Sequence, residues 1–337
     1  MIKEEQDGFK MNIYLPKRNP ASHKGSYGKC LILAGAEGMA GAAYFAALSA
    51  YRSGTGLVKL CSAKENCGIL QSLIPEAIIL SFSKEKEHFQ EVEKAIEWAD
   101  FLLFGPGMGT GEEAKELLRL VLEKGKVPLL IDADGLNLLS KDSALQTLAK
   151  AYGRKSLLFL TPHLMEFSRL SGKSLTEIEN RGGEIAKSFG KEYHCILLLK
   201  SHDTMVISPE GELVYHREKS CAALSKGGSG DVFAGSIAGI YLILEEEAKR
   251  KAKADLSQTA FSLEGSNEKN SDVVKEDSSV MPIGQGCKAA ILSCEAQILA
   301  GELAAREWGE HGVLTENIAN AMGKALDLLE EQGCLID

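Results

Sequence analysis

The sequence has few aromatic residues, no excess of positive charge and no long hydrophobic run. Lys and Arg total 38 residues against 47 Asp and Glu, which gives a net charge of −9 and argues against a nucleic-acid or anionic-membrane surface. No apolar run approaches the roughly 20 residues of a membrane-spanning helix, and residues 1–7 lack a signal-peptide pattern. We therefore expect a cytoplasmic protein without a nucleic-acid or membrane partner.

The eight cysteines form neither a CxxC pair nor a Cys/His cluster with the spacing of a zinc site. Most of them lie in apolar runs, as Cys30 and Cys195 do, so we expect reduced thiols in the core. Glycine, in contrast, is abundant: 34 of the 337 residues exceed the usual share of about 7%. This excess predicts tight backbone turns.

Short apolar runs alternate with helical patterns along most of the chain, which is typical of an α/β protein. Because the runs are continuously apolar, we expect a mainly parallel sheet that helices cover on both faces. The expected strands are Cys30–Ala34, Leu57–Cys61, Ala77–Phe82, Phe101–Phe104, Pro128–Asp132, Ser156–Leu160 and Cys195–Leu199, followed by an antiparallel edge hairpin of Met205–Ser208 and Leu213–His216. The expected helices are Gly41–Arg52, Glu87–Trp98, Glu112–Glu123, Ala144–Tyr152 and Leu175–Phe189.

The C-terminal third begins with a long expected helix, Gly228–Glu247, and ends with two more, Lys288–Trp308 and Thr315–Gln332. Between them, residues 248–285 are polar, with mixed charge, and we expect a flexible insertion. The order of strands and helices is otherwise unbroken. We therefore predict one domain over residues 10–337 that contains the insertion 248–285.

The sharpest motif is the glycine-rich segment Lys226–Asp231, which precedes a helix rich in small residues. Amides at a helix N-terminus favour an anion, and glycine lets a phosphate approach the backbone closely. Asp231 would then lie beside an anion hole and serve as general base for a hydroxyl group. The alternative is an ordinary acidic residue in the first turn of a helix.

Other glycine-rich segments do not match the standard phosphate-binding patterns. Neither Gly28-Lys29 nor Gly172-Lys173 has the earlier glycine of a Walker A loop. Gly105–Gly111 follows a strand but lacks the dinucleotide-binding spacing, so it is either a ligand-facing loop or only a turn. Asp132 and Asp134 end a strand where α/β proteins bind ligands, although such residues also cap helices.

An ordered set of motifs extends over about residues 20–245 and 287–330. The motifs are His23–Gly28, Ile32–Gly35, Gly38–Ala43, Arg52–Val58, Gly105–Gly109, Asp132–Asn137, Thr161–His163 with Glu166–Leu170, Lys226–Asp231 and Leu299–Ala304. With these motifs the chain resembles the ribokinase-like superfamily and, more closely, the ADP/ATP-dependent NAD(P)H-hydrate dehydratase family, in a form without an epimerase domain. The resemblance implies a three-layer α/β/α sandwich with a mostly parallel sheet and a short antiparallel edge hairpin.

The resemblance also implies an activity: hydrated NADH or NADPH is phosphorylated on its C6 hydroxyl from ADP or ATP, with Mg²⁺, and then loses phosphate. It implies homotetramers and a possible separate NAD(P)H-hydrate epimerase as a partner. The residues carried over are Asp231 as the catalytic base; Ala43, Gly107, His163 and Asp231 for the substrate; Lys200, Ser201, His202, Asp203, Thr204 and Gly230 for the nucleotide; and Gly228, Ser229 and Gly230 for the anion hole. No metal ligand can be named.

Each of these residues also has a structural interpretation. His163 could cap the helix that follows it, Ala43 could be a packing residue, and Lys200 could lie on the surface of the hairpin. Two positions depart from the family pattern: Ser201 replaces a glycine, and residues 219–223 replace an Asn- and Gly-rich stretch. A small-molecule hydroxyl kinase of the same superfamily, or an inactive nucleotide-binding protein, would share most of these residues.

Overall fold

The computed structural model describes residues 11–82, 86–201, 203–217, 220–265 and 284–336. Its centre is a nine-stranded sheet with the order β10-β9-β8-β7-β6-β5-β2-β3-β4. The strands are β2 (Lys29–Leu33), β3 (Leu57–Ala63), β4 (Ile78–Phe82), β5 (Phe101–Phe104), β6 (Leu129–Ile131), β7 (Leu158–Leu160), β8 (Ile196–Leu199), β9 (Thr204–Ile207) and β10 (Leu213–Arg217). In this spatial order, all strands from β8 through to β4, including β2 and β3, are parallel to one another. Strands β9 and β10 form an antiparallel hairpin at the edge. The predicted sheet is confirmed.

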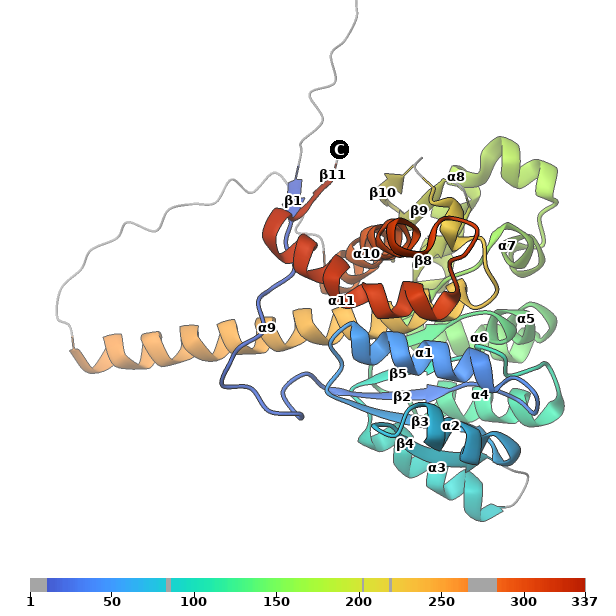
Figure 1. The fold of residues 1–337 in the computed structure, drawn as a ribbon, viewed down its shortest axis with the longest axis horizontal. Helices are drawn as coiled ribbons and strands as arrows, with labels where there is room; N and C mark the ends of the chain where they lie inside the picture. The colour runs from blue at the N-terminus through green and yellow to red at the C-terminus, as the bar shows by residue number, and fades with distance from the viewer. Residues whose placement is uncertain (1–10, 83–85, 202, 218–219, 266–283, 337) are drawn as a thin grey trace, which may run out of the picture.

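Helices cover both faces of this sheet (Figure 1), because alternate side chains of the parallel strands enter two separate cores. In β2, Cys30 and Ile32 belong to one core and Leu31 and Leu33 to the other. The first face carries α1 (Ala40–Arg52), α2 (Cys67–Leu73), α9 (Ser229–Gly265), α10 (Gln285–Trp308) and α11 (Thr315–Gln332). The second carries α3 (Lys86–Trp98), α4 (Glu112–Lys124), α5 (Asp134–Lys141), α6 (Ser143–Gly153), α7 (Leu164–Ser171) and α8 (Leu175–Tyr193).

Helices α1 and α9 pack so closely that only glycine fits at two positions of α9. A Cβ atom on Gly239 would lie 2.6 Å from Ser53 Cβ, and one on Gly235 would overlap the Ala46 carbonyl. The small residues that the sequence places after the glycine-rich segment therefore serve helix packing. This contact fixes the N-terminus of α9 relative to α1.

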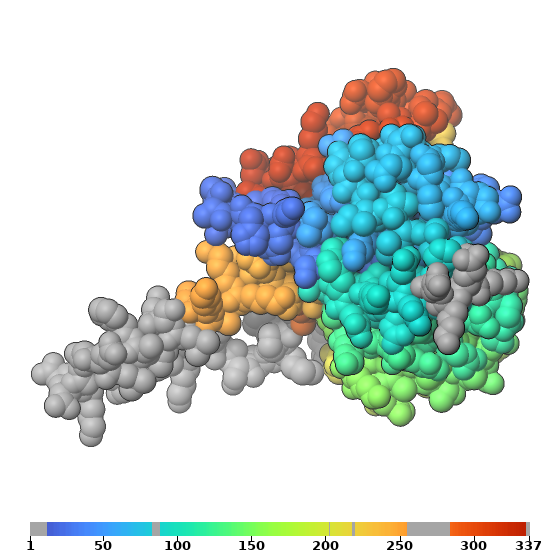
Figure 2. All heavy atoms as spheres, turned by 90° about the horizontal axis from the view of Figure 1, so that it is seen from below, coloured from blue at the N-terminus to red at the C-terminus, as the bar shows by residue number. Residues whose placement is uncertain are grey.

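Helix α9 is longer than the sequence suggests, so the expected end at Glu247 is wrong. The helix continues to Gly265 and extends away from the body of the molecule (Figure 1), and its orange part also projects from the body in Figure 2. Ion pairs one turn apart, Lys249–Glu245 and Lys251–Glu247, accompany good helix-forming residues there, and both favour helix despite the polar composition. The remaining insertion residues 266–283 lie outside the described part.

Several small elements are not predicted from the sequence. Strands β1 (Met11–Ile13) and β11 (Cys334–Ile336) pair with each other and join the two ends of the described chain. The short helices α2 and α5 and the 3₁₀ turns η1 (Lys64–Asn66) and η2 (Ala222–Leu224) are also additional. All eight cysteines are reduced thiols, and all except Cys67 and Cys221 are buried, as expected. None of the described helices is long and apolar enough to cross a membrane.

Candidate functional site

The site lies where the parallel strands end, at the point where the strand order reverses. Strands β2 and β5 are neighbours in the sheet although β3 and β4 lie between them in sequence, and ligands of α/β proteins bind at such a switch point. The loops after these two strands are joined by backbone hydrogen bonds, from Gly35 N to the Pro106 carbonyl (2.9 Å) and from Ala36 N to the Gly107 carbonyl (2.6 Å). The Gly105–Gly111 loop therefore lies at the edge of the sheet where ligands of α/β proteins bind. This position agrees with its interpretation as a ligand-facing loop.

The glycine-rich segment forms the N-terminus of α9. Gly228 has a φ of +93°, and a Cβ atom there would lie 2.8 Å from the Phe45 ring and 3.0 Å from Thr315. Only glycine tolerates both the conformation and the crowding. The amides of Gly230 and Asp231 donate to no acceptor among the described residues, so they are available to an anion.

Asp132 and Lys200 form a buried pair beside this helix N-terminus. Asp132 is 2% exposed, and its Oδ1 accepts hydrogen bonds from Lys200 Nζ and from Thr161 Oγ1, both at 2.7 Å. A Cβ atom on Gly230 would lie 3.7 Å from Lys200 Nζ and 3.9 Å from Asp132 Oδ2. The pair thus adjoins the glycine-rich segment, and the alternative interpretation of Lys200 as a surface residue of the hairpin is not observed.

Between the two aspartates after β6 the backbone is strained. Ala133 has a φ of +47°, which is rare for a residue with a Cβ atom. This turn directs Asp134 toward the loop after β5, where its Oδ2 accepts a hydrogen bond from Gly109 N at 2.8 Å. Asp134 therefore holds the Gly105–Gly111 loop in place, and Asp132 holds Lys200.

Asp231 lies in the first turn of α9, among these charged groups. Burial raises the pKa of its carboxyl to about 7, the negative charges of Asp132 and Asp134 also raise it, and the positive charge of Lys200 lowers it. A carboxylate with a pKa near neutrality can accept a proton from a hydroxyl group efficiently. The geometry and the pKa support the general-base interpretation of Asp231.

His163 caps helix α7, which confirms its structural interpretation. Its Nδ1 accepts hydrogen bonds from the amides of Met165 (3.1 Å) and Glu166 (3.2 Å), while Glu166 Oε2 accepts one from His163 N (2.9 Å). Because Nδ1 is an acceptor, the neutral ring carries its proton on Nε2, which lies 3.4 Å from Glu166 Oε1. The side chain is still half exposed at the mouth of a cavity, where a ligand could reach it.

A cavity of about 570 Å³ opens beside the anion hole and contains most of the residues expected to bind the nucleotide. Lys200, Ser201, Thr204 and Gly230 line it. Asp203 instead lines a separate cavity next to α8, and His202 lies outside the described residues. Apolar side chains such as Phe233 and Ile298 and the polar Gln297 complete the wall of the larger cavity.

Ser201 fits the turn where the family pattern has glycine. Its hydroxyl donates to the Asp203 carbonyl (2.6 Å) and accepts from Asp203 N (3.0 Å). Its φ is not positive, so the Cβ atom causes no backbone strain. The serine therefore stabilises the turn for which the family pattern has a glycine.

Two residues expected to contact the substrate lie below the surface. Ala43 has no exposed surface, and a Cβ atom on Gly35 would lie 2.9 Å from the Ala43 methyl group. Gly107 is buried, with a φ of +58°, and lies directly against Met39 and Ala42 of the α1 N-terminal region. Both residues shape the loop at the switch point, and their contact with a substrate stays a prediction.

Sequence reasoning missed the contribution of the C-terminal helices. Arg217 of β10 lines the cavity and forms an ion pair with Glu295 of α10, which also accepts a hydrogen bond from Tyr215. Gln297 of α10 and Thr315 of α11 donate to carbonyls of the glycine-rich segment. No local motif marks these residues, because only the docking of α10 and α11 on α9 brings them to the site.

The described residues contain no group of three or more His, Cys, Asp or Glu side chains arranged to hold a metal ion. Mg²⁺ in nucleotide sites usually takes most of its ligands from phosphate oxygens and water. The side chains present thus do not build a metal site by themselves. We assign no residue to a metal.

Comparison with known proteins gives consistent results. Residues 30–280 match the family model described as NAD(P)H-hydrate dehydratase. An ADP-dependent (S)-NAD(P)H-hydrate dehydratase of Listeria monocytogenes is 34% identical over 70% of this chain and 79% of its own length. The bifunctional NAD(P)H-hydrate repair enzymes Nnr of Moorella thermoacetica and Escherichia coli are 32% and 33% identical, and the matches cover only 43% and 41% of their lengths.

Solved structures agree in fold. A Bacillus subtilis ADP/ATP-dependent NAD(P)H-hydrate dehydratase, co-crystallised with ATP/Mg²⁺, has a TM-score of 0.69 at 24% identity, over 93% of this chain and 94% of its own. A ribokinase-like superfamily protein of Enterococcus faecalis has a TM-score of 0.68 at 23% identity, over 93% and 92%. The fold is therefore ribokinase-like. Together with the family match, these features show that the chain belongs to the NAD(P)H-hydrate dehydratase family.

Proposed function

We propose that this protein converts (6S)-hydrated NADH and NADPH back to NADH and NADPH with ADP or ATP as phosphoryl donor. The observation that carries the proposal is the position of Asp231, which lies in the first turn of α9 between free backbone amides and the Asp132–Lys200 pair. Membership of the dehydratase family supports this substrate class. The same site chemistry would serve a hydroxyl kinase, so the product distinguishes the two functions.

In the proposed reaction, Asp231 accepts the proton of the C6 hydroxyl while that oxygen attacks the terminal phosphorus of the nucleotide. The bond from phosphorus to the leaving nucleotide oxygen breaks, and the open amides of Gly228 and Gly230 stabilise the negative charge of the transferring group. The Ser229 amide, expected in the anion hole, instead donates to the Lys226 carbonyl (3.3 Å). The C6–O bond then breaks with loss of phosphate, and a proton leaves C5 to restore the ring double bond. One ADP is thus converted to AMP and phosphate, or one ATP to ADP and phosphate.

The nucleotide would occupy the cavity of about 570 Å³ next to the anion hole. Lys200, Ser201, Thr204 and Gly230 line this cavity and would contact the nucleotide; Asp203 and His202 stay predictions for the adjoining turn. Ala43, Gly107, His163 and Asp231 are the corresponding proposals for the hydrated dinucleotide. A bound Mg²⁺ would offset polyphosphate charge, and no step here depends on a protein ligand for it.

The direct test incubates the protein with chemically hydrated NADH and, separately, ADP or ATP, and follows recovery of the near-ultraviolet absorbance of reduced nicotinamide. We expect recovery with at least one nucleotide, with one phosphate released per NADH formed. Asp231→Asn should lose turnover and retain nucleotide binding. Stable phosphorylation of a simple alcohol without recovery of NADH would support the hydroxyl kinase instead.

Further parts of the proposal concern the surroundings of the protein. We propose a homotetramer in the cytoplasm and a separate NAD(P)H-hydrate epimerase that supplies the substrate epimer. The bifunctional names of the partly matched relatives support such a pairing of activities. Light scattering after size-exclusion chromatography tests the tetramer, and cell fractionation tests the location.

A further inference from the structure

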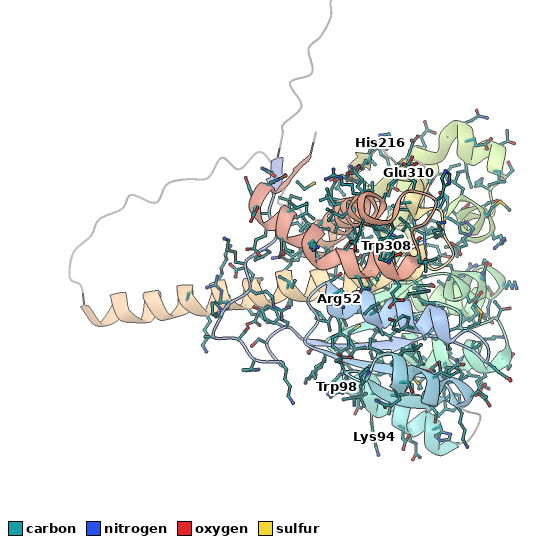
Figure 3. All side chains as sticks on the ribbon, in the orientation of Figure 1. Arg52, Lys94, Trp98, His216, Trp308 and Glu310 are labelled. Atoms are coloured by element: carbon teal, nitrogen blue, oxygen red, sulfur yellow. The ribbon has the colours of Figure 1, made fainter. Side chains whose placement is uncertain are left out.

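Two side chains from the C-terminal helices bind backbone carbonyls of the glycine-rich segment. Thr315 Oγ1 donates to the Gly227 carbonyl at 2.6 Å, and Gln297 Nε2 donates to the Ser229 carbonyl at 2.7 Å. Thr315 is 5% exposed and Gln297 is half-buried, so water has only limited access to either hydrogen bond. In Figure 3, Trp308 and Glu310 mark the turn that leads from α10 into α11, just before Thr315.

The planarity of the peptide bond makes these bonds relevant to the anion hole. In a trans peptide the carbonyl of one residue and the N–H of the next point in opposite directions, and no described peptide is cis. A fixed Gly227 carbonyl therefore fixes the direction of the Gly228 N–H. A fixed Ser229 carbonyl fixes the direction of the Gly230 N–H in the same way.

The segment needs such support because glycine restrains its own backbone poorly. Gly227, Gly228 and Gly230 have no side chains that could hold the peptide units in one orientation. Thr315 also packs its methyl group against Gly228, where a Cβ atom would lie 3.0 Å away. The carbonyl side of the segment is thus held by α10 and α11. On the other side, Ser229 N donates to the Lys226 carbonyl (3.3 Å), and the amides of Gly228 and Gly230 stay open among the described residues.

A second observation indicates that the open side receives a ligand. Ser229 is 7% exposed and lines the cavity, and its Oγ has no hydrogen-bond partner among the described residues. An unpaired buried hydroxyl costs free energy unless a ligand or water satisfies it. This hydroxyl adjoins the same amides, so one phosphate could engage all of these donors.

We infer that Thr315 and Gln297 are positioning residues that orient the amides of the anion hole toward the transferring phosphoryl group. The inference rests on the proposed function, because it takes the glycine-rich segment as the site of that group. Thr315 does not line the nucleotide cavity, whereas Gln297 does, so Thr315 gives the cleaner test of this role. Their effect reaches the phosphate through the peptide units of Gly227–Gly230.

Binding of ADP and of adenosine to the whole protein, measured by calorimetry, tests the inference without the dehydratase reaction. Thr315→Val keeps the shape of the side chain and removes the hydroxyl donor, and Gln297→Leu removes the amide donor. We expect each variant to bind ADP about tenfold more weakly, with unchanged affinity for adenosine, which lacks a phosphate. Thr315→Ser should restore the affinity for ADP.

Helix α6, on the opposite face of the sheet, provides matched controls. Thr147 Oγ1 donates to the Ser143 carbonyl (2.9 Å), and Gln146 Nε2 donates to the Leu139 carbonyl (3.0 Å). Thr147→Val and Gln146→Leu remove the same chemical groups and should leave the affinity for ADP unchanged. Thermal unfolding of all variants checks that the binding assays compare folded proteins.

The kinetic prediction separates positioning from structural support. If hydrated NADH is a substrate, Thr315→Val should also lower kcat about tenfold, with little change in KM for hydrated NADH, because misaligned amides stabilise less of the additional charge that develops in the transition state. Equal loss of ADP and adenosine binding, or unchanged ADP binding, would overturn the inference. Selective loss of ADP binding in a protein that restores no NADH would support the inference and refute the proposed function.

Discussion

In the proposed reaction, Asp231 decides how the activity depends on pH, because its carboxyl must be ionised to accept a proton. With its pKa raised to about 7, kcat/KM should fall about tenfold for each pH unit below that value. The charge of Asp134 contributes to the raised pKa, so Asp134→Asn should move the midpoint of the pH–rate profile to lower pH. The asparagine can still accept the Gly109 N–H, and Asp327→Asn on α11 is a control for charge at an exposed position. An unchanged midpoint would contradict the assigned base.

The same carboxyl also links stability to pH. Its pKa is higher in the folded protein than the roughly 4 of an unfolded chain, so the folded state binds the proton more tightly. Raising the pH from about 4 to about 7 therefore lowers the free energy of unfolding. Asp231→Asn lacks this penalty, and its gain in Tm over the wild type should be larger at about pH 8 than at about pH 5. A gain independent of pH would show that the Asp231 pKa is not raised.

At the scale of elements, the contact between α1 and α9 fixes the position of α9. Gly239→Ala would place a methyl group 2.6 Å from Ser53 Cβ, so we expect a loss of about 1–3 kcal/mol in the free energy of unfolding. Gly68→Ala in α2 is the matched control, because no atom lies within 4 Å of its new Cβ. There, alanine should be neutral or stabilise the helix by up to about 1 kcal/mol. Urea unfolding measures both, and equal effects would refute the packing argument.

At the scale of the whole molecule, α9 before the insertion and α10 after it contact the same ring of the central sheet. Tyr241 of α9 packs against Phe159, with ring centroids 6.2 Å apart, and a Cβ atom on Gly286 of α10 would lie 3.3 Å from the same ring. The residues of α9 from Lys249 to Ala254 are exposed. Replacing residues 250–282 with a short Gly-Ser linker should therefore leave kcat and KM unchanged and Tm nearly so. A large loss of activity would show that the insertion takes part in the function.

The sequence by itself determined the α/β class, the parallel strands, the edge hairpin and the anion-hole motif. Each depends on residues close together in the chain: buried strands are continuously apolar, and a positive φ beside a helix N-terminus requires a glycine such as Gly228. The family motifs likewise led to Asp231, Lys200 and His163. They left open whether His163 caps a helix or contacts a ligand, and the structure shows the cap.

Only the tertiary structure decided which distant residues complete the site. Asp132, Thr161 and Lys200 end successive strands, and the sheet brings their side chains together. Thr315 and Gln297 reach the glycine-rich segment because α10 and α11 bury their apolar faces against α9, a contact without a local pattern. The length of α9 also depended on ion pairs along its surface that composition alone conceals. The acidic charge argued against nucleic-acid and anionic-membrane surfaces, whereas packing between distant segments brought the residues of the candidate site together.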